Sequence, residues 1–308
     1  MAPQLLWIGL GNMGRGMVKN LVEKGNLEKP LIIYNRTRKR SEELAAKLPE
    51  GKTEIIDSLE DGIKKADIIF TIVSNDAVVQ SVYQDLLKGD VAGKLFVDCS
   101  TIHPDTTNKV AKLVTDKAAQ FVASPVFGAP PAAEAGMLVF VPAGAKSSIE
   151  KIRPYFKGVM GKAEIPFEDK PQSDALKLKL IGNSFILNTV TMLGEGLTLA
   201  EKTGVGVEPL QQLVDILIGG VYSIYADRMI KGTYWKMEEP LFSADNARKD
   251  GGHAMKLAES VGVDLKTVAV ADDYLKSVAE YAGGDKGDIA GIYGSARLKA
   301  GLKYENDA

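Results

Sequence analysis

The feature that most constrains the fold of this chain is a glycine pattern at the end of its first apolar run. Leu5 to Leu10 is typical of a β-strand, and a helical pattern follows as far as Glu23. Between them the chain reads G-x-G-x-x-G, in which the first glycine allows a tight turn, the second admits a pyrophosphate and the third packs helix on strand. The positive end of the helix attracts the phosphates. The residues predicted to hold a dinucleotide here are Gly9, Leu10, Gly11, Asn12, Met13 and Gly14.

The rest of the first half alternates apolar runs with helical patterns. The further strands are predicted at Leu31–Tyr34, Ile68–Val73, Leu95–Val97, Phe121–Ala123 and Met137–Pro142, with a helix starting near Ser41. Strands that alternate with helices indicate a parallel sheet with both faces covered. Together with the glycine turn, this predicts an α/β Rossmann domain with a doubly wound parallel sheet.

The second half contains no convincing strand. Ser173 to Glu201 is predicted as a single long helix, apolar almost all round in its middle and closed by Gly204. Pro166 and Pro171 flank a charged stretch between the halves. We therefore predict a dinucleotide-binding domain at residues 1–168 and an all-α substrate and dimerisation domain at residues 169–308.

Composition excludes several classes of protein. The 308 residues include 38 basic and 40 acidic side chains, whereas a general nucleic-acid binder carries a basic excess. One cysteine, Cys99, and two histidines, His103 and His253, provide neither a disulfide nor a Cys/His zinc site. No metal is assigned to the site, and a metal held by carboxylates stays open as an alternative. Neither a basic n-region nor 18 uninterrupted apolar residues occur, which predicts a cytoplasmic protein without membrane contact.

The segment after the second strand predicts which dinucleotide binds. An acidic residue there would accept the ribose hydroxyls of NAD, but the chain reads Asn35-Arg36-Thr37-Arg38-Lys39-Arg40. A guanidinium pairs with a 2′-phosphate, so NADP is predicted, with Asn35, Arg36 and Thr37 as contacts. The alternative is a solvated basic loop, which we favour for Lys39 and Arg40.

The ends of the third and fourth strands should line the same crevice, because ligands sit at the carboxyl ends of parallel strands. Val73, Ser74 and Asn75 follow one of these strands, and Ser100 and Thr101 follow the other. Small polar residues at such places also cap helices, and that alternative stays open for Asn75.

Four blocks in order resemble the β-hydroxyacid dehydrogenases, a family that includes 3-hydroxyisobutyrate dehydrogenases and glyoxylate/succinic semialdehyde reductases within the 6-phosphogluconate dehydrogenase superfamily. After the glycine turn, Asp98-Cys99-Ser100-Thr101 is similar to the family's D-x-S-T substrate motif. Lys179-Leu180-Ile181-Gly182-Asn183 is similar to its catalytic K-x-x-x-N helix. Lys249-Asp250 and a glycine-rich segment from Gly283 to Asp288 complete the set, which covers essentially the whole chain.

The resemblance implies hydride transfer between a nicotinamide and a hydroxyl- or carbonyl-bearing carbon, with Lys179 handling the proton. Lys179 and Asn183 are four residues apart and share one helix face. Asn183 would orient the substrate or the lysine, Ser100 would bind the substrate, and Thr101 and Lys249 would lie near the nicotinamide. The alternatives are a solvated surface role for each lysine and a packing role for Asn183.

The chain departs from the family where a D-A-P-V-S-G-G segment is usual. It reads Ala123-Ser124-Pro125-Val126-Phe127-Gly128-Ala129, so Phe127 replaces a serine that would help to hold a carboxylate. Phe127 and Gly128 are assigned to substrate binding, and the exchange favours a bulkier or less polar substrate. Ser173-Asp174-Ala175 stands where the family has G-x-G.

These observations predict an NADP(H)-dependent oxidoreductase acting on a semialdehyde, ketoacid or bulkier ketone. Two alternatives stay open: an imine reductase or reductive aminase, against which Lys179 argues, and a non-catalytic NADP-binding sensor. The long apolar helix and the resemblance imply a homodimer.

Overall fold

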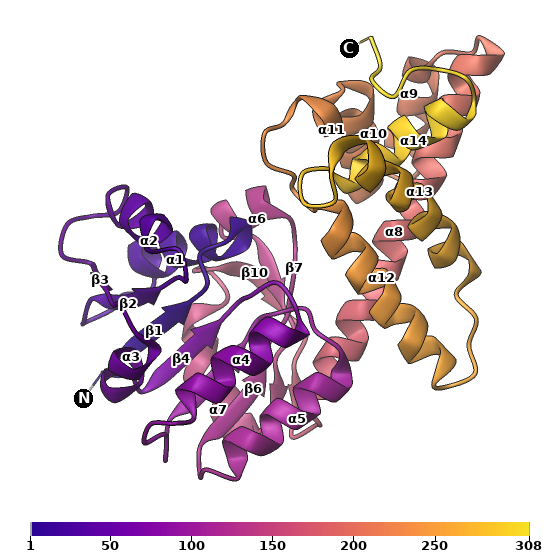
Figure 1. The fold of residues 1–308 in the computed structure, drawn as a ribbon. Coiled ribbons are helices and arrows are strands. Elements are labelled where there is room, and N and C mark those ends of the chain that lie inside the picture. Colours follow the sequence, from indigo (N-terminus) through magenta and orange to yellow (C-terminus); the bar gives the residue numbers. More distant parts are fainter. Residues whose placement is uncertain (1, 308) are drawn as a thin grey trace. The chain divides into compact units, whose positions relative to one another are not determined.

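The computed structural model describes residues 2–307, which fall into two compact units, Met1–Lys179 and Leu180–Ala308 (Figure 1). The predicted domain boundary between residues 168 and 169 stays a prediction. Among the helices of the described chain, none is both long and apolar enough to cross a membrane.

The first unit is built on an eight-stranded sheet in the order β11-β9-β6-β5-β4-β1-β2-β3. All pairs are parallel except β6 with β9. The strands are β1 Leu5–Ile8, β2 Leu31–Tyr34, β3 Thr53–Ile55, β4 Ile68–Thr71, β5 Leu95–Asp98, β6 Gln120–Ala123, β9 Ala143–Gly144 and β11 Phe167–Glu168. A small second sheet joins β10 Gly161–Glu164, β8 Leu138–Phe140 and β7 Val126–Phe127.

Apolar side chains on the two faces of the large sheet form two separate cores. One core includes side chains from α1 Asn12–Lys24, α2 Arg38–Ala45, α6 Pro130–Glu134 and α7 Lys146–Ile152, which continues into the 3₁₀ turn Arg153–Tyr155. The other includes α3 Leu59–Lys65, α4 Asp76–Leu86, α5 Pro104–Thr115 and the first turn of α8. Both faces of the parallel sheet are thus covered, as the alternating pattern predicts.

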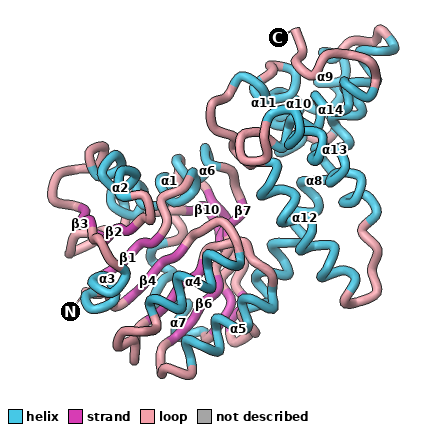
Figure 2. The backbone as a smooth tube through the Cα atoms, viewed as in Figure 1, coloured by secondary structure: helices cyan, strands magenta, loops and turns pink. Residues whose placement is uncertain are grey.

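The second unit is helical (Figure 2). Helix α8 spans Ser173–Thr203 and ends where Gly204 adopts a φ of +77°. It is followed by α9 Val207–Leu217, α10 Gly220–Ile230, α11 Thr233–Lys236, α12 Ala244–Glu259, α13 Lys266–Ala282, the 3₁₀ turn Ile289–Gly291 and α14 Ile292–Lys299. The side chains of Leu187, Val190, Leu193 and Leu197 on α8 enter the core of this unit.

The predicted fold class is confirmed, and the differences are local. Strands β3, β7, β9, β10 and β11 are not predicted from the sequence, since none of them is a long apolar run. Lys39 and Arg40, for which a solvated loop is predicted, lie in the first turn of α2. Lysine and arginine are good helix formers, so a basic run does not by itself indicate a loop.

Candidate nucleotide and substrate site

The three glycines of the first turn have the geometry that their proposed roles require. Gly9 has a φ of +100°, and a Cβ there would lie 2.0 Å from the Ile72 carbonyl oxygen. A Cβ on Gly14 would lie 2.1 Å from the Gly9 oxygen, so the start of α1 packs directly on the turn. A Cβ on Gly11 would meet no atom within 4 Å. The space above Gly11, at the start of α1, therefore fits a phosphate that approaches the backbone.

Asn35 fixes the same turn from the neighbouring strand. Its Oδ1 accepts a hydrogen bond of 2.9 Å from the Leu10 amide, and its Nδ2 donates to the Thr37 carbonyl oxygen at 3.0 Å. The Gly9 amide donates to the Tyr34 carbonyl oxygen at 3.0 Å. Asn35 thus joins the ends of β1 and β2, which gives it a structural function in addition to the predicted contact. Leu10 is buried, Met13 packs against the core, and the Asn12 side chain accepts from Arg15 at 2.9 Å.

The basic residues after β2 differ in their partners. Arg38 forms ion pairs with Glu42 and Asp57, and the Nζ of Lys39 lies 3.7 Å from the Oε1 of Glu43. Arg36 is exposed and forms no ion pair with any residue of the described chain. Arg40 likewise forms no ion pair within the described chain, so Arg36 differs from it in lying directly after β2. Thr37 is exposed beside it.

The ends of β4 and β5 are joined by the predicted substrate serine. The Val73 amide donates to the Ser100 Oγ at 3.0 Å, and Ser100 is 1% exposed. Asn75 caps α4, because its Oδ1 accepts from the Val78 amide at 3.0 Å. Ser74 is exposed and Thr101 is half-buried. The structure thus brings Val73 and Ser100 together and supplies the capping role that was left open for Asn75.

A buried carboxyl group that we did not assign to the site lies under this turn. Asp98 is 3% exposed, and the Ser100 amide donates to its Oδ1 at 2.7 Å. Burial raises the pKa of Asp98 from 3.8 to about 6, against the opposing effect of the Ser100 amide and of the neighbouring Ser100 and Tyr83 hydroxyls. The neighbouring thiol of Cys99 is also buried, and its pKa is raised well above the usual value by burial. Asp98 belongs to the D-x-S-T motif, so a sequence signal for it existed.

Lys179 lies against Phe127, the residue at which the sequence departs from the family that it resembles. Its Nζ is 4.5 Å from the centre of the Phe127 ring, and the lysine is 8% exposed. Phe127 stands at the end of β7 and Lys179 in the second turn of α8. A cation over an aromatic face is attracted by the negative face of the ring. The next residue, Gly128, has a φ of +133°, a backbone conformation that residues with a side chain rarely adopt.

Asn183 stands one turn after Lys179 on α8 and contacts the fourth sequence block. Its Nδ2 donates to Asp250 Oδ2 at 2.7 Å, and Lys249 Nζ lies 3.2 Å from Asp250 Oδ1. Asn183 and Asp250 are 5% and 3% exposed. Asp250 therefore connects Asn183 with Lys249. In the sequence, only its place in the motif Lys249-Asp250 pointed to a function for Asp250. Lys177, by contrast, is exposed and paired with Asp174 at 2.8 Å.

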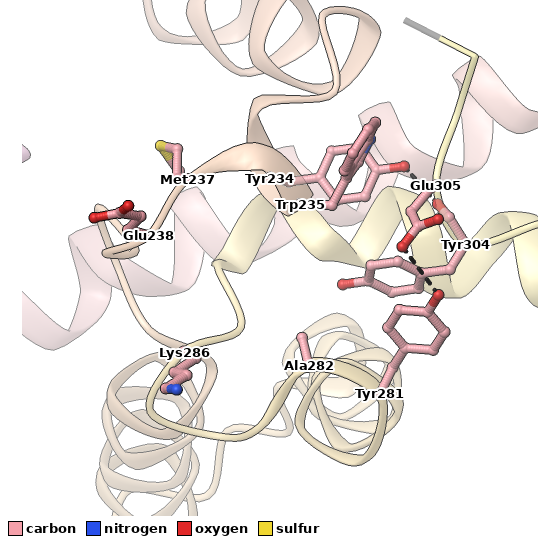
Figure 3. A pocket seen from close by; sticks show the side chains of 9 residues that line it. All are labelled: Tyr234, Trp235, Met237, Glu238, Tyr281, Ala282, Lys286, Tyr304 and Glu305. Atoms are coloured by element: carbon pink, nitrogen blue, oxygen red, sulfur yellow. Dashed lines mark hydrogen bonds between the residues drawn. The ribbon is translucent and has the colours of Figure 1, made fainter.

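The helical unit also contains a pocket of about 400 Å³ that includes none of the predicted site residues (Figure 3). Tyr281 stacks on Tyr304 with 4.0 Å between ring centres and donates to the Glu305 carboxylate at 3.3 Å. These contacts hold the C-terminal segment against α13. Within residues 2–307 no three His, Cys, Asp or Glu side chains are grouped so that they could hold a metal ion.

The doubly wound sheet, the glycine turn at the start of α1 and the open space above Gly11 define a dinucleotide-binding domain. Residues 4–166 match the family profile described as the NAD binding domain of 6-phosphogluconate dehydrogenase. The chain is 34% identical to the NADH-dependent oxidoreductase ucdB of Aspergillus ustus, over 95% of this chain and 98% of that protein. It is 28% identical to glyoxylate/succinic semialdehyde reductase 1 of Arabidopsis thaliana, over 91% and 93% of the two chains.

Among solved structures, the fold is similar to 3-hydroxyisobutyrate dehydrogenase of Mycobacterium tuberculosis with L-serine. The TM-score is 0.81 at 22% identity, and the likeness covers 96% of this chain and 100% of that chain. The chain belongs to the β-hydroxyacid dehydrogenase family of the 6-phosphogluconate dehydrogenase superfamily. It is an NAD(P)-binding oxidoreductase of the 3-hydroxyisobutyrate dehydrogenase type.

Proposed function

We propose that the protein reduces a carbonyl compound with NADPH, reversibly, and that Lys179 is the general acid and base of the reaction. The observation that carries this proposal is the buried ammonium group of Lys179 held at 4.5 Å against the Phe127 ring. An amine that solvent barely reaches, on the helix that carries the family's K-x-x-x-N motif, is suited to exchange a proton with a substrate oxygen.

When bound, the cofactor supplies the hydride that adds to the carbonyl carbon. The Lys179 ammonium donates a proton to the carbonyl oxygen as the C=O double bond becomes a C–O single bond, and solvent then restores the proton to the lysine. In the oxidative direction the neutral amine removes the hydroxyl proton. Asn183, held by Asp250, orients the substrate oxygen or the lysine, and Ser100 binds the substrate.

The proposed preference for NADP depends on Arg36, whose charge has no partner within the described chain. Gly11, Asn12 and the following turn of α1 would hold the pyrophosphate, and Arg36 the 2′-phosphate. The relative from Aspergillus ustus is named as NADH-dependent, so the preference of this chain has to be measured.

The proposed substrate carries an apolar group next to its carbonyl. Phe127 offers a ring face where a serine would otherwise help to hold a carboxylate, and that ring already covers one side of the Lys179 ammonium. A semialdehyde, ketoacid or bulkier ketone with an apolar substituent fits this surface better than a small, highly charged hydroxyacid. The same ring also favours the alternative of imine reduction.

The test is a screen for NADPH and NADH consumption with semialdehydes, ketoacids, aryl and alkyl ketones and cyclic imines. We expect turnover of carbonyl compounds, and a loss of about 10²- to 10⁴-fold in kcat for Lys179→Met with unchanged NADPH binding. Lys177→Met, on the same helix and exposed, is the matched control. Turnover of imines alone would favour the imine reductase, tight NADPH binding without any turnover would favour the sensor, and full activity of Lys179→Met would refute the role of the lysine.

We also propose a homodimer, supported by an apolar stripe on α8. Phe185 and Leu199 are 68% and 64% exposed, and Ile181 and Met192 fall on the same helix face at spacings of four and seven residues. Exposed apolar surface of this extent marks a contact surface in soluble proteins. The occupant that we propose is the same stripe on a second copy, since a two-fold interface is self-complementary.

A further inference from the structure

A cluster of buried polar groups lies beneath the turn that carries Ser100 and Thr101. Thr71 on β4 and Asp98 on β5 are paired in register, so their side chains share one face of the sheet. Tyr83 on α4 lies on that face, with its ring against Phe96 and Phe121. Tyr83 and Thr71 are 0% exposed.

Asp98 is the residue of this cluster that forms a hydrogen bond with the turn carrying Ser100 and Thr101. Its Oδ1 accepts the Ser100 amide at 2.7 Å, while the Ser100 Oγ accepts the Val73 amide at 3.0 Å. The position of Ser100 is therefore set from both strand ends at once. A hydrogen bond to an ionised carboxylate is roughly twice as strong as one to a neutral acceptor, so the charge of Asp98 matters for this contact.

The other carboxylate oxygen has a different environment. Asp98 Oδ2, the Tyr83 hydroxyl and Thr71 Oγ1 are all buried without a hydrogen-bond partner of good geometry. If Asp98 is protonated, it becomes a donor that these hydroxyls can accept, and its bond from Ser100 weakens at the same time. The cluster can thus satisfy its polar groups in two ways that differ in how firmly Ser100 is held.

The charged and titratable groups around Asp98 offer it no compensating cation. Tyr83 and Asp76 belong to α4, and Cys99 is its neighbour at the end of β5. Helix α5 contributes the apolar side chains of Val110 and Val114 to the same core. Within the described residues no lysine, arginine or histidine forms an ion pair with Asp98. Burial raises the pKa of the Asp98 carboxyl to about 6, and the charge of Asp76 acts in the same direction.

We propose that Asp98 is a positioning residue, assisted by Tyr83, whose charge holds the Ser100–Thr101 turn in place and whose protonation in mildly acid solution releases it. The inference deepens the proposed function, because Ser100 is assigned there to substrate binding. It predicts that the affinity for substrate falls on mild acidification through the loosening of this turn.

The first experiment needs no substrate, so it separates failure of this inference from failure of the proposed reaction. Amide hydrogen exchange of peptides spanning residues 95–103 is followed by mass spectrometry from pH 5 to pH 8 and corrected for intrinsic rates. We expect protection of the Ser100 amide in the native chain to fall about tenfold across this range toward acid pH. Asp98→Asn should give a pH-independent level, and Asp85→Asn, an exposed carboxyl on α4, should behave as the native chain does.

Tyr83→Phe keeps the buried ring and removes only the hydroxyl that favours the charged form of Asp98. The loss of protection should therefore begin at a higher pH in this variant. Protection that does not change with pH in the native chain, or that changes equally in Asp98→Asn, overturns the inference. An unchanged Tyr83→Phe profile overturns the part assigned to Tyr83.

A second readout separates positioning from simple stability. With succinic semialdehyde as the probe substrate, the KM of the native enzyme should rise below pH 6.5 while the KM for NADPH changes less. In Asp98→Asn this acid rise should be absent at a kcat that remains measurable. A KM profile that is the same in both proteins contradicts the assignment.

Discussion

The side chain of Asp288 forms hydrogen bonds with three segments of the helical unit. We expect its substitution to lower the stability of the protein strongly. The carboxylate is 1% exposed, and its Oδ1 accepts from the Arg228 guanidinium at 2.5 Å and from the Ala290 amide at 2.9 Å. Its Oδ2 accepts from the amides of Leu241 and Phe242 at 2.9 and 3.3 Å. Helix α10, the segment before α12 and the 3₁₀ turn at Ile289 therefore meet at one side chain.

The expected loss follows from these contacts. Removing one member of a buried ion pair costs about 3–5 kcal/mol, because the other charge is left without a partner. Each buried amide that loses its acceptor adds about 1–3 kcal/mol, partly offset as the site relaxes. We expect Asp288→Ala to lower the free energy of unfolding by about 5 kcal/mol, which is most of the stability of a marginal domain. The corresponding fall in Tm is roughly 10–20 °C.

The assay is thermal and urea unfolding of the full chain, followed by circular dichroism at 222 nm because the second unit is helical. Asp285→Ala is the matched control, since Asp285 is exposed in the same glycine-rich segment. Asp288→Asn keeps the acceptor geometry without the charge and should fall between the two. A Tm of Asp288→Ala within about 2 °C of the native protein would refute the reasoning.

Four further outcomes are expected. Arg36→Asp should weaken NADPH binding roughly tenfold to hundredfold and leave NADH binding nearly unchanged, as measured by fluorescence titration; equal losses would count against the phosphate role. Phe127→Ser should raise kcat/KM for carboxylate-bearing substrates relative to aryl ketones, and an unchanged ratio would contradict its role in specificity. Because the pKa of Asp98 is raised from 3.8 to about 6, the folded state binds this proton more tightly than the unfolded chain does. Stability should therefore fall by about 3 kcal/mol as the pH rises through this window, and urea titrations of Asp98→Asn should lack that component. Phe185→Glu should yield monomers in sedimentation experiments, and an unchanged dimer would exclude the α8 stripe as the interface.

The sequence predicts the architecture because the strands at the centre of the sheet are apolar runs that can be recognised from their own residues. Runs such as Leu31–Tyr34 are apolar throughout, as strands buried on both faces must be, and the structure has this strand with the same bounds. Strand β9 has only two residues, and its place between β11 and β6 depends on pairing with residues far away in the chain. No local pattern contains that information.

The candidate site likewise has features that can be predicted locally and contacts that only the folded chain creates. The glycine turn is predictable because each glycine has a local steric reason, whereas the contact between Asn183 and Asp250 joins residues 67 positions apart. Phe127 could be recognised as a departure from the family, but its position over the Lys179 ammonium is a tertiary contact. Composition and periodicity therefore locate the motifs, and only the folded chain shows which side chains support them.

Two of the buried carboxylates, Asp288 and Asp98, show how environment separates a structural acid from a responsive one. Asp288 has an arginine and three backbone amides as partners, so its charge is compensated and its contacts link chain segments. Asp98 has one amide, from Ser100, and faces hydroxyl groups without a cation. A buried charge without a counter-ion is neutralised near the pH at which a proton replaces the missing partner. Substitution of Asp288 should accordingly change stability at every pH, whereas substitution of Asp98 should change how stability and the Ser100 turn respond to pH.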